Sequence, residues 1–337
     1  MHSVRLYGEL EVILYAIYYF VEPKAEISIM HSESDSPLVT VVVPTRARPA
    51  FLSNCLESLL KLDYPSDRYE IIVVEDGTET GQEITERIRQ RSPVPVRYKR
   101  ISHSGAATSR NVGLLLSTAE IVAFIDDDAM AVPGWLRRLV HGLLQDGVAG
   151  VGGRVSPDYP EHLLEAGMGR GGDLRWSGFN AAPVTVQEVD HLPGGNMAFW
   201  RQALVEVQGL DTRFTRRGSW REDTDLCVRL RHRGYRLLYD GEARIIHRAV
   251  RWTDSWERMR PGLVWAMTRD DTYFRVKNYG RSGVWGAFRS AATSVKNRFV
   301  HGAANLFLIP VHVLALIPGI VKGLRSKRDP NGTLGAE

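Results

Sequence analysis

Strand-like runs and helix-like segments alternate along the first half of the chain. The runs are Leu38–Val43, Tyr69–Val74, Val94–Lys99 and Ile121–Ile125, and the segments with helical spacing between them are Ala50–Leu60, Ile84–Arg91 and Ser104–Leu116. The last run does not alternate with polar residues, which is typical of a strand buried on both faces. Because strands that alternate with helices form βαβ units, the pattern predicts an α/β fold with a mostly parallel central sheet flanked by helices.

Polar clusters follow three of the predicted strands. They are Pro44–Arg48, Glu75-Asp76 and Asp126–Asp128. In open parallel sheets, ligands bind beyond the carboxyl ends of the strands, so we expect these clusters to share one edge and form a binding site. No GxGxxG motif follows the first strand, and no GxxxxGK[ST] motif occurs in the sequence. A nucleotide at this edge would therefore be held by the loop after the first strand and by the acids.

The densest of these clusters is Asp126–Asp128. Adjacent carboxylates repel one another and need a cation, a basic partner or a shifted pKa. Alternate residues of a strand share a face, so Asp126 and Asp128 can point the same way. A carboxylate pair that leaves coordination positions open suits a hard divalent ion that also holds substrate phosphates. A solvated acidic turn or a helix N-cap is the alternative interpretation.

Composition adds little to this picture. The chain has 337 residues, of which 44% are hydrophobic and 24% charged, which is enough for one large α/β domain with additions. The net charge of +4 is modest, and no nucleic-acid-binding signature accompanies it. Cys55 and Cys227 fall in predicted helices, which favours buried thiols in a reducing compartment over a disulfide or a zinc site. No signal peptide is expected, because no basic region precedes a cleavable apolar segment.

Six segments between Val39 and His247 together resemble glycosyltransferase family 2, a large group with the GT-A fold. In chain order they are VVVPTRARPAFLSNCLESLL, IIVVEDGT, GAATSRNVGL, FIDDDAMAVPGWL, GGNMAFWRQAL and WREDTDLCVRLRHRGYRLLYDGEARIIH. Each segment alone is a weak signal, and their common order is specific. The resemblance implies a GT-A (Rossmann-like) sheet, a nucleotide-sugar donor, expected to be a UDP-sugar, and Mn²⁺ or Mg²⁺. It also implies transfer to a hydroxyl group with inversion at the anomeric carbon.

The resemblance assigns a nucleoside pocket to the ends of the first two strands. Pro44, Thr45 and Arg46 are expected to line this pocket. Glu75 and Asp76 match the acidic pair that recognises the base and the ribose, although the family usually has Asp at the first position. The longer Glu75 side chain leaves open which of the two acids reaches the base. A turn built on Asp76 at the strand end is the alternative interpretation.

Arg110 and Asn111 match an Arg-Asn pair that lies near the nucleotide in the family. An arginine there can pair with phosphate or with the aspartates, whereas the alternative is an ordinary surface residue. Asp126 and Asp128 match the DxD-type pair, so Asp128 is expected to contact the metal and Asp126 the ribose or the metal. Asp127 is expected to lie next to the substrate site and to tolerate replacement.

Two later segments add candidates for the metal and the sugar. His247 matches the family's C-terminal histidine, which implies a third metal ligand, and imidazole suits Mn²⁺ better than Mg²⁺. A structural histidine is the alternative. Gly194, Gly195 and Asn196 match the loop that faces the donor sugar and the acceptor. The two glycines let the backbone approach a ligand, or simply form a turn.

A second acidic cluster opens the predicted helix Thr224–Arg233. The resemblance makes Asp223 the catalytic base, with Glu222 and Asp225 orienting it or the acceptor, and Trp220 is a candidate platform for a sugar ring. Acids in a first helical turn also interact favourably with the helix dipole, so simple capping is the alternative. As base, Asp223 would deprotonate the acceptor hydroxyl that attacks opposite the diphosphate.

The chain is expected to divide into three parts. They are an N-terminal helical segment and linker (1–36), a catalytic domain (37–250, with halves 37–132 and 133–250) and a helical C-terminal region (251–337). Within the last part, residues 305–321 are strongly apolar, contain Pro310 and Pro318 and have basic flanks.

A helix over residues 305–321 would be about 26 Å long, which is short of a bilayer core. We therefore expect a monotopic or re-entrant anchor on an anionic membrane surface, with packing against the catalytic domain as the alternative. Such an anchor favours a cytoplasmic protein at the inner face of the cell membrane and a lipid-linked or polysaccharide acceptor.

Two other functions are compatible with parts of the sequence. A sugar nucleotidyltransferase should carry a glycine-rich, Arg-containing loop after the first strand, and Val43–Pro49 lacks the glycines. A catalytically silent, sugar- or membrane-binding family member is the other alternative. The presence of Asp126, Asp128, Asp223 and His247 together argues against it.

Overall fold

The computed structural model describes residues 36–158, 185–214, 221–248, 261–300 and 309–326. Several predictions therefore concern residues outside the described ones. They are the N-terminal helix and linker up to residue 35, Trp220, and the parts of the C-terminal region at 251–260, 301–308 and 327–337.

The first half of the sheet has the predicted parallel arrangement. Its strands are β1 (Val39–Thr45), β2 (Tyr69–Asp76), β3 (Val96–Ile101) and β4 (Ile121–Ile125). They lie in the order β3-β2-β1-β4, and every neighbouring pair is parallel. β4 has the predicted bounds and is buried along its whole length. β1, β2 and β3 extend past their predicted ends, so Thr45 and Glu75 belong to paired strands and not to loops.

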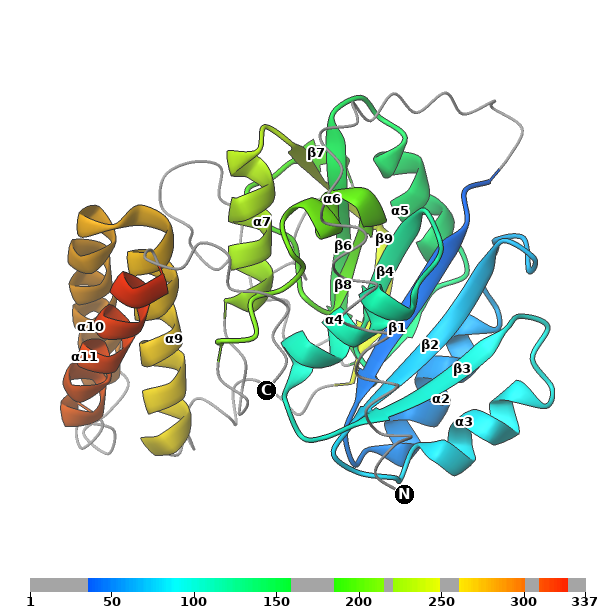
Figure 1. Ribbon diagram of the computed structural model, residues 1–337, viewed down its shortest axis with the longest axis horizontal. Helices are drawn as coiled ribbons and strands as arrows, with labels where there is room; N and C mark the ends of the chain where they lie inside the picture. The colour runs from blue at the N-terminus through cyan, green and yellow to red at the C-terminus, as the bar shows by residue number, and fades with distance from the viewer. Residues whose placement is uncertain (1–35, 159–184, 215–220, 249–260, 301–308, 327–337) are drawn as a thin grey trace, which may run out of the picture. The chain divides into compact units, whose positions relative to one another are not determined.

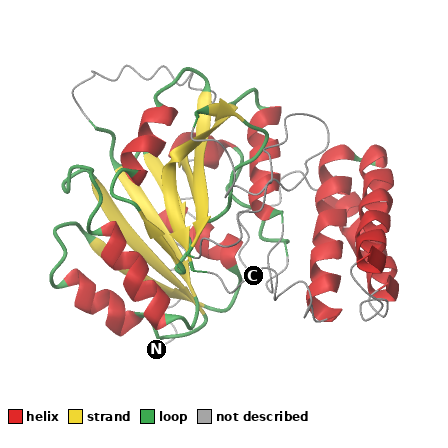
Figure 2. Ribbon diagram, turned by 180° about the vertical axis from the view of Figure 1, so that it is seen from behind, coloured by secondary structure: helices red, strands yellow, loops and turns green. Residues whose placement is uncertain are grey.

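Helices cover both faces of this half-sheet (Figures 1 and 2). They are α2 (Pro49–Leu59), α3 (Gln82–Arg89) and α4 (Ala106–Leu116). A crossover between parallel strands is almost always right-handed, so helices that connect strands in opposite directions lie on opposite faces. The connections through α2 and α3 run from β1 towards β3, and the one through α4 runs back to β4. The strand order therefore explains why α2 packs on α3 while α4 packs on β1 and β2.

The second half of the sheet is mixed. It comprises β5 (Ala129–Ala131), β6 (Val148–Pro157), β7 (Gln187–Glu188), β8 (Asn196–Trp200) and β9 (Arg236–His247), with helices α5 (Trp135–Leu143), α6 (Arg201–Glu206) and α7 (Glu222–His232). The order continues β4-β8-β6-β9-β5, and β7 pairs with β9. β8 is antiparallel to β4 and β6, and β5 is antiparallel to β9. Antiparallel neighbours need no crossover helix, so the alternation of strands and helices did not reveal this half.

The C-terminal region is helical, as predicted. Its helices are α9 (Pro261–Tyr279), α10 (Arg281–Val300) and α11 (Ile309–Ser326), and both α10 and α11 pack on α9. The compact unit that begins at Pro37 holds these helices together with the sheet. In the part of the chain that the structure describes, no helix is both long enough and apolar enough to cross a membrane.

Buried ion pairs join α9 to the region around α7. The Nζ of Lys277 lies 2.7 Å from Oδ2 of Asp211 and also 2.7 Å from Oδ2 of Asp225. Burial acts to raise the pKa of Asp211, but Lys277 and Arg213 outweigh it and hold that pKa well below its ordinary value. The Nε of Arg221, just before α7, donates to Oδ1 of Asp271 at 3.0 Å. These contacts fasten the first turn of α7 to the C-terminal helices.

Replacing Lys277 with Met should lower the free energy of unfolding by about 3 kcal/mol, because it leaves two buried carboxylates without their shared cation. Urea unfolding followed by circular dichroism measures this change. The exposed Lys61 offers a matched control, and Lys61→Met should change the free energy of unfolding by less than about 0.5 kcal/mol. A loss at Lys277 no larger than at Lys61 would show that the buried pairs do not hold α9 in place.

Candidate active site

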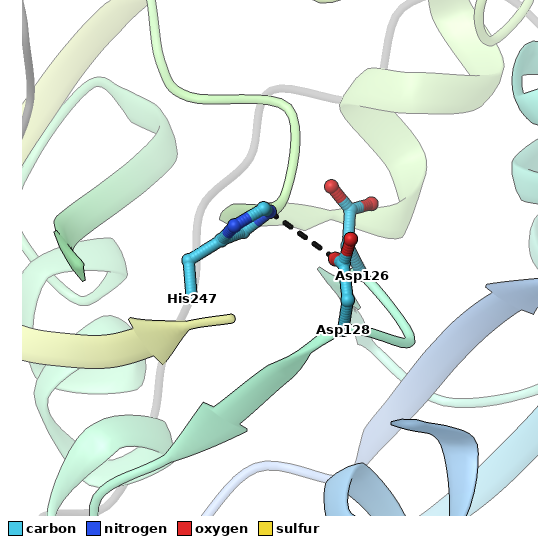
Figure 3. A group of neighbouring side chains, drawn as sticks. All are labelled: Asp126, Asp128 and His247. Carbon is cyan, nitrogen blue, oxygen red and sulfur yellow. Dashed lines mark ion pairs between the residues drawn. The ribbon is translucent and has the colours of Figure 1, made fainter. Parts of the chain in front are cut away.

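Strand pairing brings Asp126, Asp128 and His247 together from distant parts of the chain. In the antiparallel pair β4–β8, Ile125 lies opposite Asn196, so Gly195 comes next to Asp126. In the pair β5–β9, Ala129 lies opposite His247, which places the imidazole beside Asp128. Ligand atoms of Asp126, Asp128 and His247 all lie within 4.8 Å of one another (Figure 3).

These three side chains fit a divalent metal ion. The Nε2 of His247 lies 3.2 Å from Oδ1 of Asp128 as an ion pair. Among the described residues, no donor is aligned to form a hydrogen bond with this buried oxygen, so it remains available to a cation. Two carboxylates and one imidazole match the donor preference of Mn²⁺ and leave positions open for phosphate oxygens. The predicted grouping of Asp126, Asp128 and His247 is thus a candidate metal site.

Attraction between neighbouring charged side chains affects the pKa values of Asp128 and His247 more than burial does. Burial acts to raise the pKa of Asp128, but His247 and Arg48 lower it below its ordinary value. Burial acts to lower the pKa of His247, but Asp128 and, more weakly, Asp126 raise it. The carboxylate of Asp128 is therefore held in the ionised form that a metal ligand requires.

Arg48 is a site residue that the sequence indicated only as part of the loop after the first strand. Its Nη1 donates to Oδ2 of Asp128 at 2.6 Å and to Oδ1 of Asp127 at 3.2 Å. Oδ2 of Asp127 accepts a hydrogen bond of 2.6 Å from Thr45. Burial raises the pKa of Asp127 to about 6, against the opposing effect of Thr45 and Arg48. Asp127 thus ties β1 to the acidic loop, and these contacts count against its expected tolerance to replacement.

Replacing Arg48 with Met should strengthen the binding of Mn²⁺ to the protein without nucleotide by about threefold to tenfold. The guanidinium neutralises Asp128 at the same place as a metal ion would, and removing a neighbouring cation of this kind changes the free energy by roughly 1 kcal/mol. Isothermal titration with Mn²⁺ measures the effect, and exposed Arg89→Met is the matched control. Weaker Mn²⁺ binding by the Arg48 variant would contradict competition between the arginine and the metal.

The other residues of the predicted nucleoside pocket lie at the ends of β1 and β2. The side chain of Pro44 is buried within β1, whereas Arg46 is exposed in the loop that follows. Glu75 is fully buried, and its carboxylate accepts hydrogen bonds from Thr78, Thr80, Gly81 and Tyr98. This carboxylate organises the loop after β2, and the structure does not bring it into the metal group.

Asp76 holds the loop before α4. Its carboxylate accepts hydrogen bonds from the backbone N–H groups of Ser104 at 2.6 Å and Gly105 at 3.2 Å. It also lies 2.7 Å from Nδ1 of His103, a residue that the sequence did not single out. These partners come from the loop after β3, so the alternative of a local turn built on Asp76 does not describe its contacts. Nucleoside recognition by Glu75 and Asp76 stays a prediction.

Arg110 and Asn111 serve different parts of the structure. The buried guanidinium of Arg110 donates to Oδ1 of Asp126 at 2.8 Å and to Oε1 of Glu222 at 3.2 Å. It therefore links an acid of the metal group to the first turn of α7. The side-chain amide of Asn111 both donates to and accepts from the backbone of Leu210, with both distances 2.8 Å. Asn111 thus fixes the loop that leads to α7. Arg110 contacts the acidic loop through Asp126, and the proximity of either residue to the nucleotide stays a prediction.

The glycine pair lies between the metal group and the predicted base. The backbone N–H of Gly194 donates to Oδ2 of Asp223 at 3.0 Å. A Cβ atom at Gly195 would overlap with the Asp126 carboxylate, so close approach requires glycine there. The pair also forms a turn, because the N–H of Asn196 donates to the carbonyl of Pro193 at 2.9 Å. Backbone approach to a ligand stays a prediction. Asn196 is fully buried, and its amide bonds Trp135 and two backbone carbonyls, so it supports the sheet.

The three acids of the first turn of α7 differ in their surroundings. Glu222 is buried against Arg110, and Asp225 is buried against Arg229 and Lys277. Asp223 is only partly buried, and its Oδ1 accepts the N–H of Thr224 at 2.7 Å. Among the described residues, no basic side chain forms an ion pair with Asp223. It is therefore the acid of this turn that can accept a proton from a substrate.

Comparison with known proteins identifies the family of this chain. The sequence pattern described as "Glycosyl transferase family 2" matches residues 40–207. A glucosyl-dolichyl phosphate glucuronosyltransferase of Haloferax volcanii is 31% identical over 232 residues, which cover 65% of this chain and 72% of that protein. The chain belongs to glycosyltransferase family 2. It is an enzyme, and its activity is glycosyl transfer.

Two further likenesses cover most of the chain of this glycosyltransferase. The succinoglycan biosynthesis protein ExoM of Rhizobium meliloti is 26% identical over 278 residues, which cover 80% of this chain and 84% of ExoM. The solved structure of a mannosyltransferase from Pyrobaculum calidifontis, in complex with GDP-Man and Mn²⁺, aligns with this chain with a TM-score of 0.54 and 17% sequence identity. The alignment covers 95% of this chain and 94% of the mannosyltransferase chain. This structural likeness confirms the predicted GT-A fold of this family 2 member.

Proposed function

We propose that this family 2 enzyme is inverting and metal-dependent. It transfers a sugar from a nucleotide-diphosphate donor, with a UDP-sugar as the first candidate, to a hydroxyl group of its acceptor. The observation that carries the proposal is the continuous connection between the metal group and Asp223. Arg110 joins Asp126 to the first turn of α7, and Gly194-Gly195 contacts both Asp126 and Asp223.

In this mechanism, Asp126, Asp128 and His247 would hold the metal ion. A bound divalent ion supplies Lewis-acid stabilisation of the departing nucleoside diphosphate. Arg48 pairs with Asp127 and Asp128 in the structure, so its guanidinium would be released on metal binding at Asp128 and could then pair with a phosphate of the donor.

Asp223 takes the proton from the acceptor hydroxyl, whose oxygen then bonds to the anomeric carbon. The bond from that carbon to the donor phosphate breaks, and its electron pair leaves with the nucleoside diphosphate. Because no carboxylate acts as a nucleophile, a single displacement inverts the configuration.

The acceptor is proposed to be a glycan, a polysaccharide or a lipid-linked sugar. Two relatives support these classes by name, since one is a glucosyl-dolichyl phosphate glucuronosyltransferase and the other a succinoglycan biosynthesis protein. A cytoplasmic position, peripheral or monotopic at the inner face of the cell membrane, belongs to the same proposal because a lipid-linked acceptor is held at a membrane surface.

A panel of nucleotide sugars, each with and without Mn²⁺, tests the donor in a thermal-shift experiment. A ligand that binds only the native state raises its stability with the logarithm of concentration over Kd. We expect UDP-sugars to raise the melting temperature only when Mn²⁺ is present. If GDP-sugars and not UDP-sugars raise the melting temperature, the proposed UDP donor is wrong. If the melting temperature rises equally without Mn²⁺, the proposed metal dependence is wrong.

A further inference from the structure

Helix α11 exposes a stripe of aliphatic side chains. They are 42% to 63% exposed and consist of Val313, Leu314, Ile317, Val321 and Leu324. At helical spacing these positions fall within an arc of about 100°. The opposite side of the helix is buried and contains Gly319 and Gly323, where a Cβ atom would overlap with Thr272 or Val276 of α9. Because the glycine side of α11 packs on α9, the aliphatic stripe faces away from α9.

Helix α10 adds exposed aromatic side chains. Trp285 is 76% exposed and Phe288 is 46% exposed. Leu316 of α11 clusters with the buried Ala287 and Ala291 of α10, so the two helices pack directly on one another. Monomeric soluble proteins rarely expose this much apolar surface on neighbouring elements without an interaction that uses it.

The charge of these helices indicates what covers the apolar side chains. Residues 272–328 contain ten Lys or Arg residues and neither Asp nor Glu. Arg275 and Lys277 pair with acids inside the protein, whereas Arg281, Arg289 and Arg325 are exposed. The last acids before this stretch, Asp270 and Asp271, are buried and paired with arginines. A second copy of the chain would bring two basic surfaces together, which costs electrostatic energy. An anionic lipid surface instead attracts basic side chains and accepts aliphatic and aromatic ones at the boundary between head groups and acyl chains.

We propose that α10 and α11 form a docking face for an anionic bilayer surface. Trp285, Phe288 and the α11 stripe enter the head-group boundary, and basic residues such as Arg281 and Arg325 contact lipid phosphates. The face differs from the anchor expected from residues 305–321, because it includes α10 and leaves the glycine side of α11 packed on α9. This role also rests on the proposed function if the acceptor is lipid-linked. In that case α9 connects the docking face to α7, which carries Asp223, through the ion pair between Lys277 and Asp225.

Co-sedimentation of the full chain with phosphatidylcholine vesicles, with and without phosphatidylglycerol, tests the proposal. The wild type should bind only the anionic vesicles. Ile317→Asp combined with Leu324→Asp should weaken this binding by at least about tenfold, because it removes apolar contact and adds charge of the wrong sign. Leu144→Asp, at a similarly exposed position after α5, is the matched control and should bind like the wild type.

Each other outcome overturns the docking face. Wild-type protein that ignores anionic vesicles, or a double variant that binds them normally, contradicts it. So does a wild-type dimer in sedimentation velocity that the double variant loses, because a second copy would then cover the face. Trp285→Ser gives an independent reading if the double variant fails to fold, and it should also weaken binding. The assay contains no donor or acceptor, so its failure is separate from failure of the proposed transfer reaction.

Discussion

Asp223→Asn should lower the turnover number for glycosyl transfer by about 10²- to 10⁴-fold while the Kd values for donor and Mn²⁺ stay within about threefold. The amide cannot accept the acceptor proton, yet it has nearly the same shape. Its single oxygen can still accept one of the two hydrogen bonds that Gly194 and Thr224 donate to different oxygens of the carboxylate. Steady-state kinetics and calorimetric binding of the donor separate the two effects.

Asp225→Asn is the matched control for that experiment, because it changes an acid of the same helical turn. Asp225 is fully buried and bonds Arg229, Lys277 and Asn278. This control should lose stability and keep turnover within about tenfold of the wild type. If the two variants lose turnover equally, or if Asp223→Asn keeps wild-type turnover, then Asp223 is not the base.

Asp128→Asn should weaken Mn²⁺ binding by at least about 100-fold and abolish metal-dependent donor binding. The substitution removes the charge from the acid that His247 and Arg48 hold ionised, and a metal contact with a carboxylate contributes several kcal/mol. Electron paramagnetic resonance of Mn²⁺ in the titrated protein reports free and bound metal directly.

Asp127→Asn serves as the matched control for the metal, since it is the neighbouring acid in the same loop. Its side chain bonds Thr45 and Arg48, and the amide can keep the first of these contacts. Mn²⁺ affinity should therefore fall by no more than about tenfold, which is the effect of one neighbouring charge and is far less than the loss at Asp128. Equal losses in the Asp127 and Asp128 variants would mean that the charge of the loop, and not a specific ligand, determines metal binding.

The parallel half of the sheet could be predicted from the sequence because its signals are local. Ile121–Ile125 is apolar throughout and ends in three aspartates, so both the strand and the acids at its end follow from neighbouring residues. The contact between His247 and Asp128 could not be derived in this way. It depends on antiparallel pairing of β5 with β9, and only the family resemblance indicated that histidine.

The orientation of polar side chains was the harder part of the prediction. Glu75, Asn111 and Asn196 were expected to meet substrate, but their polar atoms bond other parts of the protein. A motif specifies which residue type stands at a position, and it does not show whether neighbouring backbone groups already use the lone pairs. Substrate contacts by these residues stay predictions.

Arg48 illustrates the opposite difficulty. An arginine in a loop after a strand resembles an ordinary exposed residue, and its side chain is indeed 48% exposed. Its importance arises only because β1 and β4 are neighbours, which puts the loop beside Asp127 and Asp128. Long-range pairing, which a single sequence does not display, thus determines most of the chemistry at this edge.

The central claim is that one displacement, assisted by Asp223 and by a metal at Asp126, Asp128 and His247, inverts the anomeric carbon. Proton NMR of the first sugar released by slow, Mn²⁺-dependent hydrolysis of an α-linked nucleotide sugar tests it most directly, with water as the acceptor. A single inverting displacement releases the β-anomer first, and this anomer mutarotates later. First appearance of the α-anomer would contradict the mechanism.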